Sequence, residues 1–434
     1  MAFNTTKLLI RSSYQNSLRC FSVHSLPDEL VSLQNMCRTF AQNELKPIAA
    51  RLDKESIFPK EQINKLAQLG LMSICVPKKW GGSEYSTLGL AVAVEEIAKG
   101  CSGTGATVSI HNCLYVDLLS RCGTDKQKEQ FLKPFTTGEV GCFALSEAGL
   151  SRCGTDKQKE QFLKPFTTGE VGCFALSEAD AGSDVSGITT TARLEGDHYI
   201  LNGTKSWVTS GSIGKAAVIF ATVDKHLKHK GISAFLVPLP SPGLSWGKLE
   251  DKLGIRASPT CSFILENVHV PRENVLGEIG EGFKIAMIQL DKARIGIAAQ
   301  AVGIGQAALD VAVQYAAHRK TFGKPISEQQ AVKLRLADMA LRIESARLLV
   351  WRAAVMHDQS QKSTKESSMA KWAASEAATF VTHAAIQVLG GMGYVSDMPA
   401  ERYYRDARIT EIYGGITDIQ KLVIGDIIIK EYGY

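Results

Sequence analysis

The 434-residue sequence predicts a multidomain α+β fold, in which a helical amino-terminal domain, an antiparallel β domain and a carboxy-terminal helical bundle follow one another. Two changes of pattern predict this order. Apolar residues recur three and four apart in the first part, short β-branched and aromatic runs fill residues 173–271, and helical spacing then returns. With 45% hydrophobic and 21% charged residues, the chain can bury large cores.

The first 24 residues carry Lys7, Arg11 and Arg19 but no acidic residue, and they are rich in Ser, Thr and Leu. This composition is typical of a mitochondrial transit peptide, and a terminus without an address function is the alternative. Without this segment the formal charge falls from +5 to +2, because three basic residues are removed. Such a small charge does not favour nucleic acid as a partner.

Residues 28–148 are expected to form the helical domain, with apolar residues at helical spacing in segments 30–52 and 88–100. This domain includes the first copy of an internal repeat. Residues 119–148 recur identically at 150–179, with only Gly149 between the two copies. Two copies do not form a solenoid, which needs several stacked units. Their identity at every position indicates a recent insertion.

Residues 149–270 are expected to contain the second repeat copy and the β domain, and residues 271–434 the helical bundle. The β domain is indicated by the runs YIL, SWVT, AVIFATV, ISAFLVPL and CSFILENVHV, with a turn at Asn202 and Gly203. The long helix predicted in the bundle has two apolar rows, so we expect it to be covered on two sides. One row is Leu336, Met339, Ile343, Ala346 and Val350, and the other is Leu334, Leu341, Leu348 and Val355.

No stretch approaches the roughly 18 uninterrupted apolar residues of a membrane helix, so a soluble protein without a membrane span is expected. The ten cysteines include no CxxC pair. Scattered cysteines of this kind are typical of small buried hydrophobes in a reducing compartment, so neither a metal site nor a disulfide framework is predicted.

Six segments together resemble the acyl-CoA dehydrogenase family, in order and in spacing. They are CFALSEADAGSD (173–184), LNGTKSWVTSG (201–211), DKLGIRAS (251–258), HRKTFGKPI (318–326), QVLGGMGY (387–394) and RYYRDARITEIYGG (402–415). The sequences SWVTS, KLGIRAS and ARITEIY within these segments are most similar to those of the short-chain members of the family. The resemblance implies a helical domain, a central antiparallel β-barrel and a four-helix bundle.

The resemblance also implies an activity and its partners. The cofactor would be FAD, and the substrate a short-chain acyl-CoA thioester that loses two hydrogens across its α and β carbons in the first step of fatty-acid β-oxidation. The assembly would be a homotetramer, the electron acceptor electron transfer flavoprotein, and the location the mitochondrial matrix. Such a reaction needs a base near the α-carbon and donors at the thioester oxygen.

The family's contact positions can be carried over to this sequence residue by residue. The positions that correspond to flavin contacts are Phe174, Ala175, Leu176, Ser177, Ser183, Trp207, Val208, Thr209, Thr417 and Asp418. The positions that correspond to contacts with the FAD of a neighbouring subunit are Arg319, Gln330, Gln387, Val388, Leu389, Gly390 and Gly391. The positions that correspond to substrate contacts are Ser183, Asp291, Lys292, Ala293, Arg294 and Gly415. Taken alone, Trp207 would be a core tryptophan, and Arg294 or Arg319 a surface charge.

The sequence departs from the family at the catalytic base. Family members place a glutamate in one of two positions, which here hold Gly414 and Ala293, so no catalytic residue is intact. Asp418 is the first carboxylate after Gly414, four residues on, and a surface or flavin-contact role is the favoured interpretation for it. The loss of a general base commonly slows a reaction by about 100- to 10,000-fold.

Three functions remain open from the sequence. The first is an acyl-CoA dehydrogenase with weak or rescued activity, and the second is a silent FAD- and acyl-CoA-binding paralogue that acts as a regulator or subunit partner. An acyl-CoA oxidase-like enzyme is the third, and it is disfavoured because such enzymes are usually longer and also need a base. We further expect the second repeat copy to occupy the flavin-loop position and one helical half to be extruded, with protease cleavage between residues 119 and 169.

Overall fold

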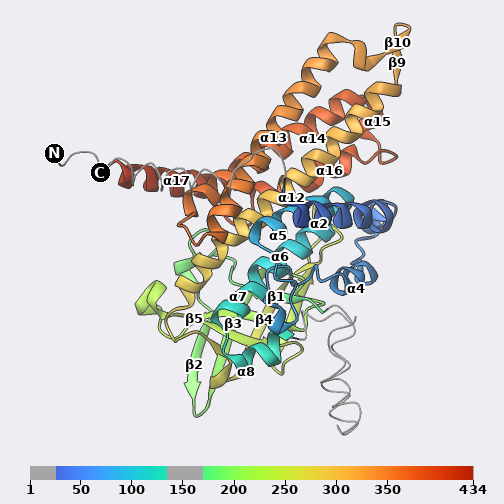
Figure 1. The fold of residues 1–434 in the computed structure, drawn as a ribbon. Helices are drawn as coiled ribbons and strands as arrows, with labels where there is room; N and C mark the ends of the chain where they lie inside the picture. Colours follow the sequence, from blue (N-terminus) through green and yellow to red (C-terminus); the bar gives the residue numbers. More distant parts are fainter. Residues whose placement is uncertain (1–25, 134–169, 434) are drawn as a thin grey trace, which may run out of the picture.

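A computed structural model describes residues 26–133 and 170–433. The β domain lies at one end of the molecule, the amino-terminal helices lie beside it, and the long carboxy-terminal helices extend away from it (Figure 1). This confirms the predicted order of a helical domain, a β domain and a second helical domain. Residues 1–25, which include the leader segment, and residues 134–169, which span the junction of the two repeat copies, lie outside the described residues.

The described amino-terminal part is mainly helical, as predicted, with a longer connection between residues 69 and 86. Its α-helices are α2 (Asp28–Phe40), α3 (Ala49–Glu55), α4 (Lys60–Gln68), α5 (Thr87–Gly100), α6 (Ser102–Ile110), α7 (Asp117–Cys122) and α8 (Asp125–Gln127). Short π-helical turns continue three of them, at η2 (Ala41–Leu45), η4 (His111–Val116) and η5 (Lys128–Leu132). Helices α5 and α6 are buried almost all round, so they form the centre of this part.

Eight strands form one mixed sheet in the order β6-β7-β3-β2-β4-β5-β8, and β1 pairs with β4. The strands are β1 (Gly172–Ala175), β2 (Thr191–Glu195), β3 (His198–Thr209), β4 (Ala216–Thr222), β5 (Ile232–Pro238), β6 (Leu244–Leu249), β7 (Thr260–Pro271) and β8 (Val275–Leu276). Among the described strands, nothing joins the end strands β6 and β8, so the expected closed barrel is wrong. The expectation of an antiparallel sheet also fails at β4, which pairs in parallel with β1 and β2.

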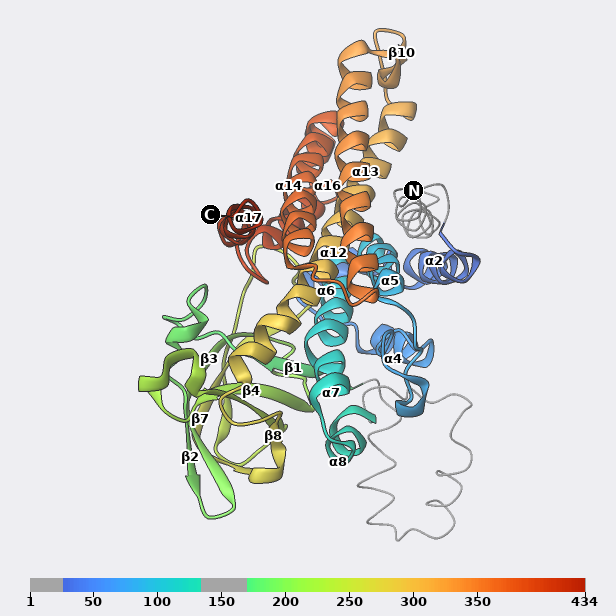
Figure 2. The same cartoon turned by 60° about the vertical axis from the view of Figure 1, so that its left-hand side comes forward.

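The carboxy-terminal part consists of three long helices and three shorter ones. They are α12 (Gly282–His318), α13 (Gln330–Asp358), α14 (Thr364–Leu389), α15 (Gly391–Tyr394), α16 (Ala400–Arg408) and α17 (Thr417–Glu431). Helices α12, α13 and α14 pack along one another, whereas α17 contacts α14 and projects from the bundle (Figure 2). A hairpin of β9 (Lys320–Thr321) and β10 (Lys324–Pro325) closes the end that lies farthest from the β domain.

The two predicted apolar rows of α13 have different environments. Met339, Ile343, Ala346 and Val350 of the first row are buried, as expected. The second row is not covered within one chain, because Leu334 and Leu341 are 65% and 66% exposed. The prediction that α13 is covered on two sides is therefore wrong for a single chain.

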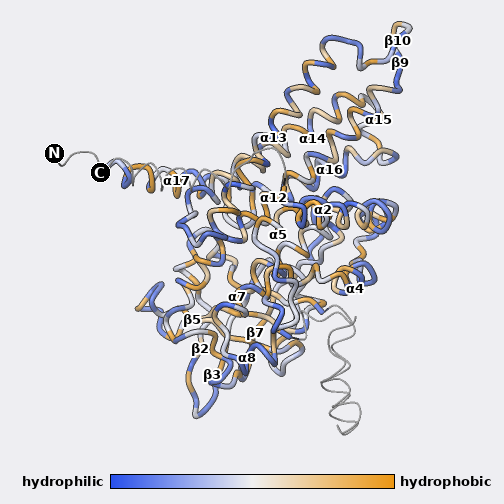
Figure 3. The backbone as a smooth tube through the Cα atoms, in the orientation of Figure 1, coloured by the Kyte–Doolittle hydropathy of each residue, from blue (hydrophilic) through white to orange (hydrophobic). Residues whose placement is uncertain are grey.

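One apolar core joins the amino-terminal helices to α12, α13 and α14, and two smaller cores lie on the faces of the sheet. Figure 3 shows apolar and hydrophilic residues alternating along these helices. Helix α12 is long and apolar enough to span a membrane by composition, but 89% of its most apolar window is buried in the fold. Burial of this extent is typical of the core helix of a globular protein.

The described parts of the two repeat copies occupy different places. The helical half of the first copy forms α7, α8 and η5, where Leu119, Phe131 and Leu132 are buried. The end of the second copy forms β1 and the segment that follows it. Residues 134–169 lie outside the described residues, so the predicted extrusion of one helical half stays a prediction.

Candidate active site

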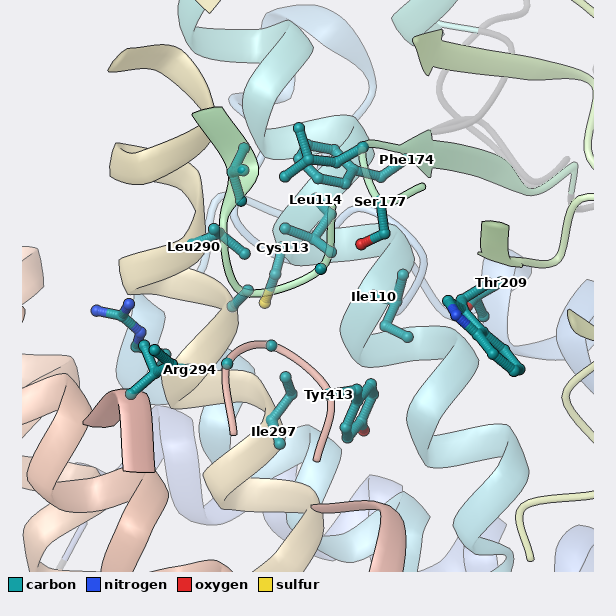
Figure 4. Close-up of a pocket in the computed structure, with 18 of the residues that line it drawn as sticks. Ile110, Cys113, Leu114, Phe174, Ser177, Thr209, Leu290, Arg294, Ile297 and Tyr413 are labelled. Carbon is teal, nitrogen blue, oxygen red and sulfur yellow. The ribbon is translucent and has the colours of Figure 1, made fainter. Parts of the chain in front are cut away.

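A pocket of about 210 Å³ lies where the β domain meets α6, η4 and α12, and the segment after α16 closes one side of it (Figure 4). Ten of the residues that the resemblance singled out line it. They are Phe174, Leu176, Ser177, Ser183, Trp207, Thr209, Ala293, Arg294, Gly414 and Gly415. Segments that are more than 100 residues apart in the sequence therefore supply one continuous site.

On the β side, an irregularity in strand pairing places Trp207 in the pocket wall. The register of β3 and β7 shifts between Lys205 and Val208, and Trp207 adopts a φ of +61°. A bulge of this kind re-aims a side chain that would otherwise follow the sheet. Trp207 is 64% exposed, so the alternative of a core tryptophan is wrong.

The residues beside Trp207 fit a flat, polar-edged cofactor. The hydroxyl groups of Ser177, Ser183 and Thr209 form no hydrogen bond with other described residues. An uncovered indole ring together with unused hydroxyl groups suits an aromatic ring system such as the isoalloxazine of FAD. The remaining positions of the sequence-based set do not line the pocket, as described below.

The segment after β1 is held by a buried ion pair below the pocket. Glu178 accepts hydrogen bonds from Lys205 Nζ at 2.7 Å, from Thr189 N at 2.6 Å and from Thr190 N at 3.0 Å. Burial alone would raise the pKa of Glu178, but the ammonium of Lys205 and these hydrogen bonds lower it to about 2. This anchor fixes Ser177 and Ser206, whose backbone groups are joined at 2.8 Å, at the pocket wall.

On the helical side, a glycine pair forms the loop that carries the first base position. Gly414 and Gly415 have φ values of +65° and +95°, a region that favours glycine. The carbonyl oxygen of Gly415 accepts hydrogen bonds from Lys371 Nζ at 2.7 Å and from Gln420 Nε2 at 2.9 Å. The loop is therefore fixed from α14 and α17.

A side chain at position 414 would project toward the pocket wall. A Cβ atom on Gly414 would lie 2.3 Å from Ile297 Cδ1, and Ile297 lines the pocket from α12. The second base position, Ala293, lies one helical turn earlier on the same helix and is 2% exposed. Both base positions thus meet at this pocket, although neither residue present can accept a proton.

The described lining contains no Asp, Glu or His. Its ionisable groups are Cys113, Arg294 and Tyr413. Burial raises the pKa of the Cys113 thiol to about 12 and raises that of Tyr413 as well, while Tyr413 Oη donates to Gln300. At neutral pH all three groups therefore hold their protons.

Arg294 is buried, so the alternative of a surface charge is wrong for it. It is 7% exposed, and its Nη1 donates to Asp291 Oδ1 at 2.8 Å and to Ser368 Oγ at 3.3 Å. Figure 4 shows Arg294 at the edge of the pocket, on α12. Asp291 itself does not line the pocket, and Thr364 Oγ1 also donates to it.

Lys292, a predicted substrate contact, points away from the pocket. Its Nζ donates to Asp117 Oδ1 at 2.6 Å, and both groups are almost fully buried. Gln289 Nε2 donates to the other oxygen of Asp117 at 2.8 Å. Lys292 therefore ties α12 to α7 and does not line the pocket, and its contact with substrate stays a prediction.

The other predicted cofactor residues do not line the pocket. Ala175 and Val208 are buried beneath it, and Thr417 and Asp418 lie on α17, with Asp418 exposed. The rest lie at the end of the helical bundle that is farthest from the β domain (Figure 1), and they are Arg319, Gln330, Gln387, Val388, Leu389, Gly390 and Gly391. This separation agrees with their expected contact with the FAD of a neighbouring subunit, which stays a prediction.

The pocket also has lining residues that the sequence did not single out. Half of them are apolar residues of α6, η4 and α12, and helical periodicity alone marks these as core. They are Ser109, Ile110, Cys113, Leu114, Gly182, Val185, Ser206, Met287, Leu290, Ile297, Tyr413 and Ile419. Gly182, Ser206 and Tyr413 lie within the segments that carry the resemblance, so these three could have been inferred from a motif.

Comparison with known families matches three stretches of the chain. Residues 27–139 match the amino-terminal domain of acyl-CoA dehydrogenases, residues 173–268 the middle domain, and residues 280–429 the carboxy-terminal domain. Together these stretches cover most of the described chain.

Individual relatives agree with this result. The chain is 51% identical to the mitochondrial short-chain specific acyl-CoA dehydrogenase of Rattus norvegicus over 94% of its own length and 92% of that protein. Butyryl-CoA dehydrogenase of Megasphaera elsdenii has a similar structure, with a TM-score of 0.84 and 37% identity over 93% and 99% of the two chains. The FAD complex of PigA is similar too, with a TM-score of 0.83 and 27% identity over 93% and 98%.

Proposed function

The chain belongs to the acyl-CoA dehydrogenase family, and we propose that it binds FAD and a short-chain acyl-CoA thioester in this pocket but turns over poorly because the catalytic base is missing. FAD is the cofactor, as in the rest of the family. Dehydrogenation of short-chain acyl-CoA is the activity that its relatives support.

One observation carries the proposal that the base is missing. No ionisable group in the described pocket lining is deprotonated at neutral pH, because Cys113 and Tyr413 have raised pKa values and Arg294 remains charged. An α-proton of a thioester needs an acceptor within hydrogen-bond reach. Water and small solutes are then the acceptors left, and they act less well than a positioned carboxylate.

The chain's own residues would perform the remaining tasks. Trp207, with Ser177 and Thr209, would hold the ring of FAD, which when bound accepts hydride from the substrate's β-carbon. The apolar side chains of Ile110, Leu114 and Leu290 would surround a short acyl chain and exclude water. The thioester would lie between these two groups, next to Gly414.

The cellular setting belongs to the proposal as well. The relatives named mitochondrial support a location in that organelle, and we propose the matrix and electron transfer flavoprotein as the acceptor. The exposed row of Leu334, Leu341 and Leu348 supports assembly into a homotetramer, because an apolar row of this length on one helix usually contacts another chain. The domain boundaries at residues 24, 148 and 270 are proposed with it.

A silent FAD- and acyl-CoA-binding paralogue is the second candidate. The same observation supports it, because every other part of the pocket is present while the proton acceptor is absent. The two candidates differ in whether the flavin is reduced at all.

Flavin bleaching distinguishes these candidates. FAD-loaded protein is mixed with butyryl-CoA in a buffer without carboxylic acids, and the visible flavin absorbance is followed. We expect slow bleaching for an impaired enzyme and none for a silent paralogue. We expect Gly414→Glu to bleach about 100- to 10,000-fold faster than the unmodified chain.

Gly425→Glu is the matched control, since Gly425 lies on α17 outside the pocket and a Cβ atom there meets nothing within 4 Å. This variant is expected to behave as the unmodified chain. If Gly414→Glu binds FAD but does not bleach it faster, the missing carboxylate is not the defect.

A further inference from the structure

Two buried cations lie near the glycine loop, and only one of them pairs with a carboxylate. Arg294 on α12 lines the pocket together with Gly415, and Lys371 on α14 donates to the Gly415 carbonyl oxygen; we call these two residues the cationic cluster. Burial and the positive charge of Arg294 lower the pKa of Lys371. Asp291 is the acidic partner of Arg294.

Arg294 keeps unused hydrogen-bond capacity at this place. Its Nη1 serves Asp291 and Ser368, but its Nε is buried and has no partner among the described residues. A guanidinium has five N–H donors, and buried donors are nearly always satisfied. The unsatisfied Nε indicates that a further acceptor belongs beside it.

Lys371 is more unusual, because it is fully buried and forms no ion pair with any described acid. Its Nζ donates to the Gly415 carbonyl oxygen. The acid that influences it is Glu411, but Glu411 accepts hydrogen bonds from Arg408 and Thr379. Burial and then Arg294 lower the pKa of Lys371 to about 7.

The charge balance of this region therefore lacks one negative group. Asp291 compensates the charge of Arg294, so protonated Lys371 is the cation that has no paired carboxylate among the described residues. A buried positive charge is costly unless an anion compensates it. The described pocket lining next to it contains no acid, and Gly414, Gly415 and Ala293 contribute no polar side chain there.

We propose that the cationic cluster binds a small carboxylate at the edge of the pocket, beside Gly414 and Gly415. A carboxylate suits the site because its two oxygens match the planar fork of a guanidinium and a second donor can bind the same group. The carboxylate has two possible sources. It is either a free acid such as acetate or the terminal carboxylate of a dicarboxylic acyl group.

The first experiment tests the free acid with the FAD-loaded full chain. Carbon-13-labelled acetate is titrated, and its NMR line width reports binding. We expect saturable binding that Arg294→Gln weakens by about 10- to 100-fold, the effect of losing a charged hydrogen bond. Arg193→Gln is the control, because Arg193 lies exposed on β2 and outside the pocket.

Two more variants keep this test decisive if Arg294→Gln does not fold, since that change leaves Asp291 without its cation. Lys371→Met removes the second cation, and Gly414→Glu supplies a carboxylate attached to the chain that competes with acetate. Both are expected to weaken acetate binding. Acetate binding that is unchanged in these folded variants would overturn acetate as the ligand of the cluster.

The second experiment tests the acyl carboxylate, and it rests on the proposed function. Binding of glutaryl-CoA is compared with that of pentanoyl-CoA, whose acyl group has the same number of carbons but no carboxylate. A preference for glutaryl-CoA that Lys371→Met abolishes supports this source. Equal affinities, together with acetate binding that depends on the cluster, assign the site to a free acid.

The proposal is overturned if neither acetate nor the glutaryl group depends on the cluster. A failure of the proposed function looks different, because then neither acyl-CoA binds while the acetate titration still gives its own answer.

Discussion

A side chain at position 414 has to fit a backbone with a φ of +65° and a Cβ position 2.3 Å from Ile297 Cδ1. The left-handed conformation costs a residue other than glycine about 1 to 2 kcal/mol. The contact with Ile297 should cost less than the backbone strain, because Cδ1 is the end of a flexible side chain and can rotate away. Restoring a glutamate therefore has a cost in stability as well as a gain in reactivity.

Gly414→Glu is expected to lower the free energy of unfolding by about 1 to 2 kcal/mol. Ile297→Val removes Cδ1, so it should cost less in the Gly414→Glu background than in the unmodified chain. Urea unfolding of both single variants and the double variant measures this coupling. Strictly additive effects would show that Ile297 and residue 414 do not meet.

Glu178 makes the stability of the site sensitive to acid. Its pKa is about 2 in the folded chain, against an ordinary value of 4.5. The stabilisation is therefore complete above about pH 4.5 and is lost as the pH falls toward 2. Across this range, the free energy of unfolding should fall more steeply with decreasing pH for the unmodified chain than for Glu178→Gln.

Equal pH slopes for the two proteins would contradict the role of Glu178. At neutral pH, Glu178→Gln should itself be destabilised by about 3 to 5 kcal/mol, because it leaves Lys205 charged and buried without its partner. The variant Glu344→Gln provides a control, since Glu344 forms its ion pair with Arg347 at an exposed position of α13.

At the scale of elements, α13 ends where it stabilises the beginning of α5. Asp358 accepts hydrogen bonds from Thr87 N at 2.6 Å and from Leu88 N at 3.1 Å, and Ser86 Oγ accepts one from Gly89 N. A carboxylate at a helix N-terminus satisfies free N–H groups and interacts favourably with the helix dipole. This contact joins the two helical domains.

Asp358→Ala should lower the free energy of unfolding by about 1 to 2 kcal/mol, the usual effect of losing a cap. Asp338→Ala on the same helix is the control, because Asp338 only pairs with the exposed Arg342 and should change stability by less than about 0.5 kcal/mol. Thermal unfolding of both variants gives the comparison. Equal shifts would mean that the cap contributes nothing.

The order of helical and β elements could be predicted from the sequence, because periodicity depends on local spacing. The buried apolar row of α13 could be predicted for the same reason. The fate of the second row, with Leu334 and Leu341, could not be predicted, because exposed and buried apolar rows have the same spacing. The open sheet was missed since strand runs do not reveal how end strands pair.

The site was predicted in part for similar reasons. Motif resemblance located Trp207, Ser177 and the glycine pair, which line the pocket. It gave no sign that Lys292 pairs with the buried Asp117, because the two residues are 175 positions apart in the sequence. It also gave no sign of Lys371, because a lysine in a helix rich in alanine and serine has no pattern that marks it as buried.

For the whole molecule, Arg405 joins all three regions. From α16 it donates through Nη2 to Asp53 Oδ2 of α3 at 2.6 Å and through Nη1 to the Leu253 carbonyl oxygen at 3.0 Å. Leu253 lies between β6 and β7. The next residue, Asp406, accepts a hydrogen bond from Ile255 N at 2.5 Å.

Arg405→Gln should loosen this junction and cost about 1.5 to 3 kcal/mol, as expected for charged hydrogen bonds. Amide hydrogen exchange at residues 251–258 should speed up, while exchange in β4 and β5 should stay slow. Arg342→Gln, an exposed change on α13, is the control. Exchange at 251–258 that matches the unmodified chain would show that Arg405 does not hold the regions together.

Proton exchange at the substrate's α-carbon tests the central claim, that the pocket lacks a proton acceptor, most directly. FAD-loaded protein is incubated with butyryl-CoA in deuterated buffer that contains no carboxylic acid, and deuterium uptake at the α-carbon is measured. We predict uptake near the rate without protein for the unmodified chain, and uptake about 100- to 10,000-fold faster for Gly414→Glu. Fast uptake by the unmodified chain would contradict the account, because another group of the protein would then remove the proton.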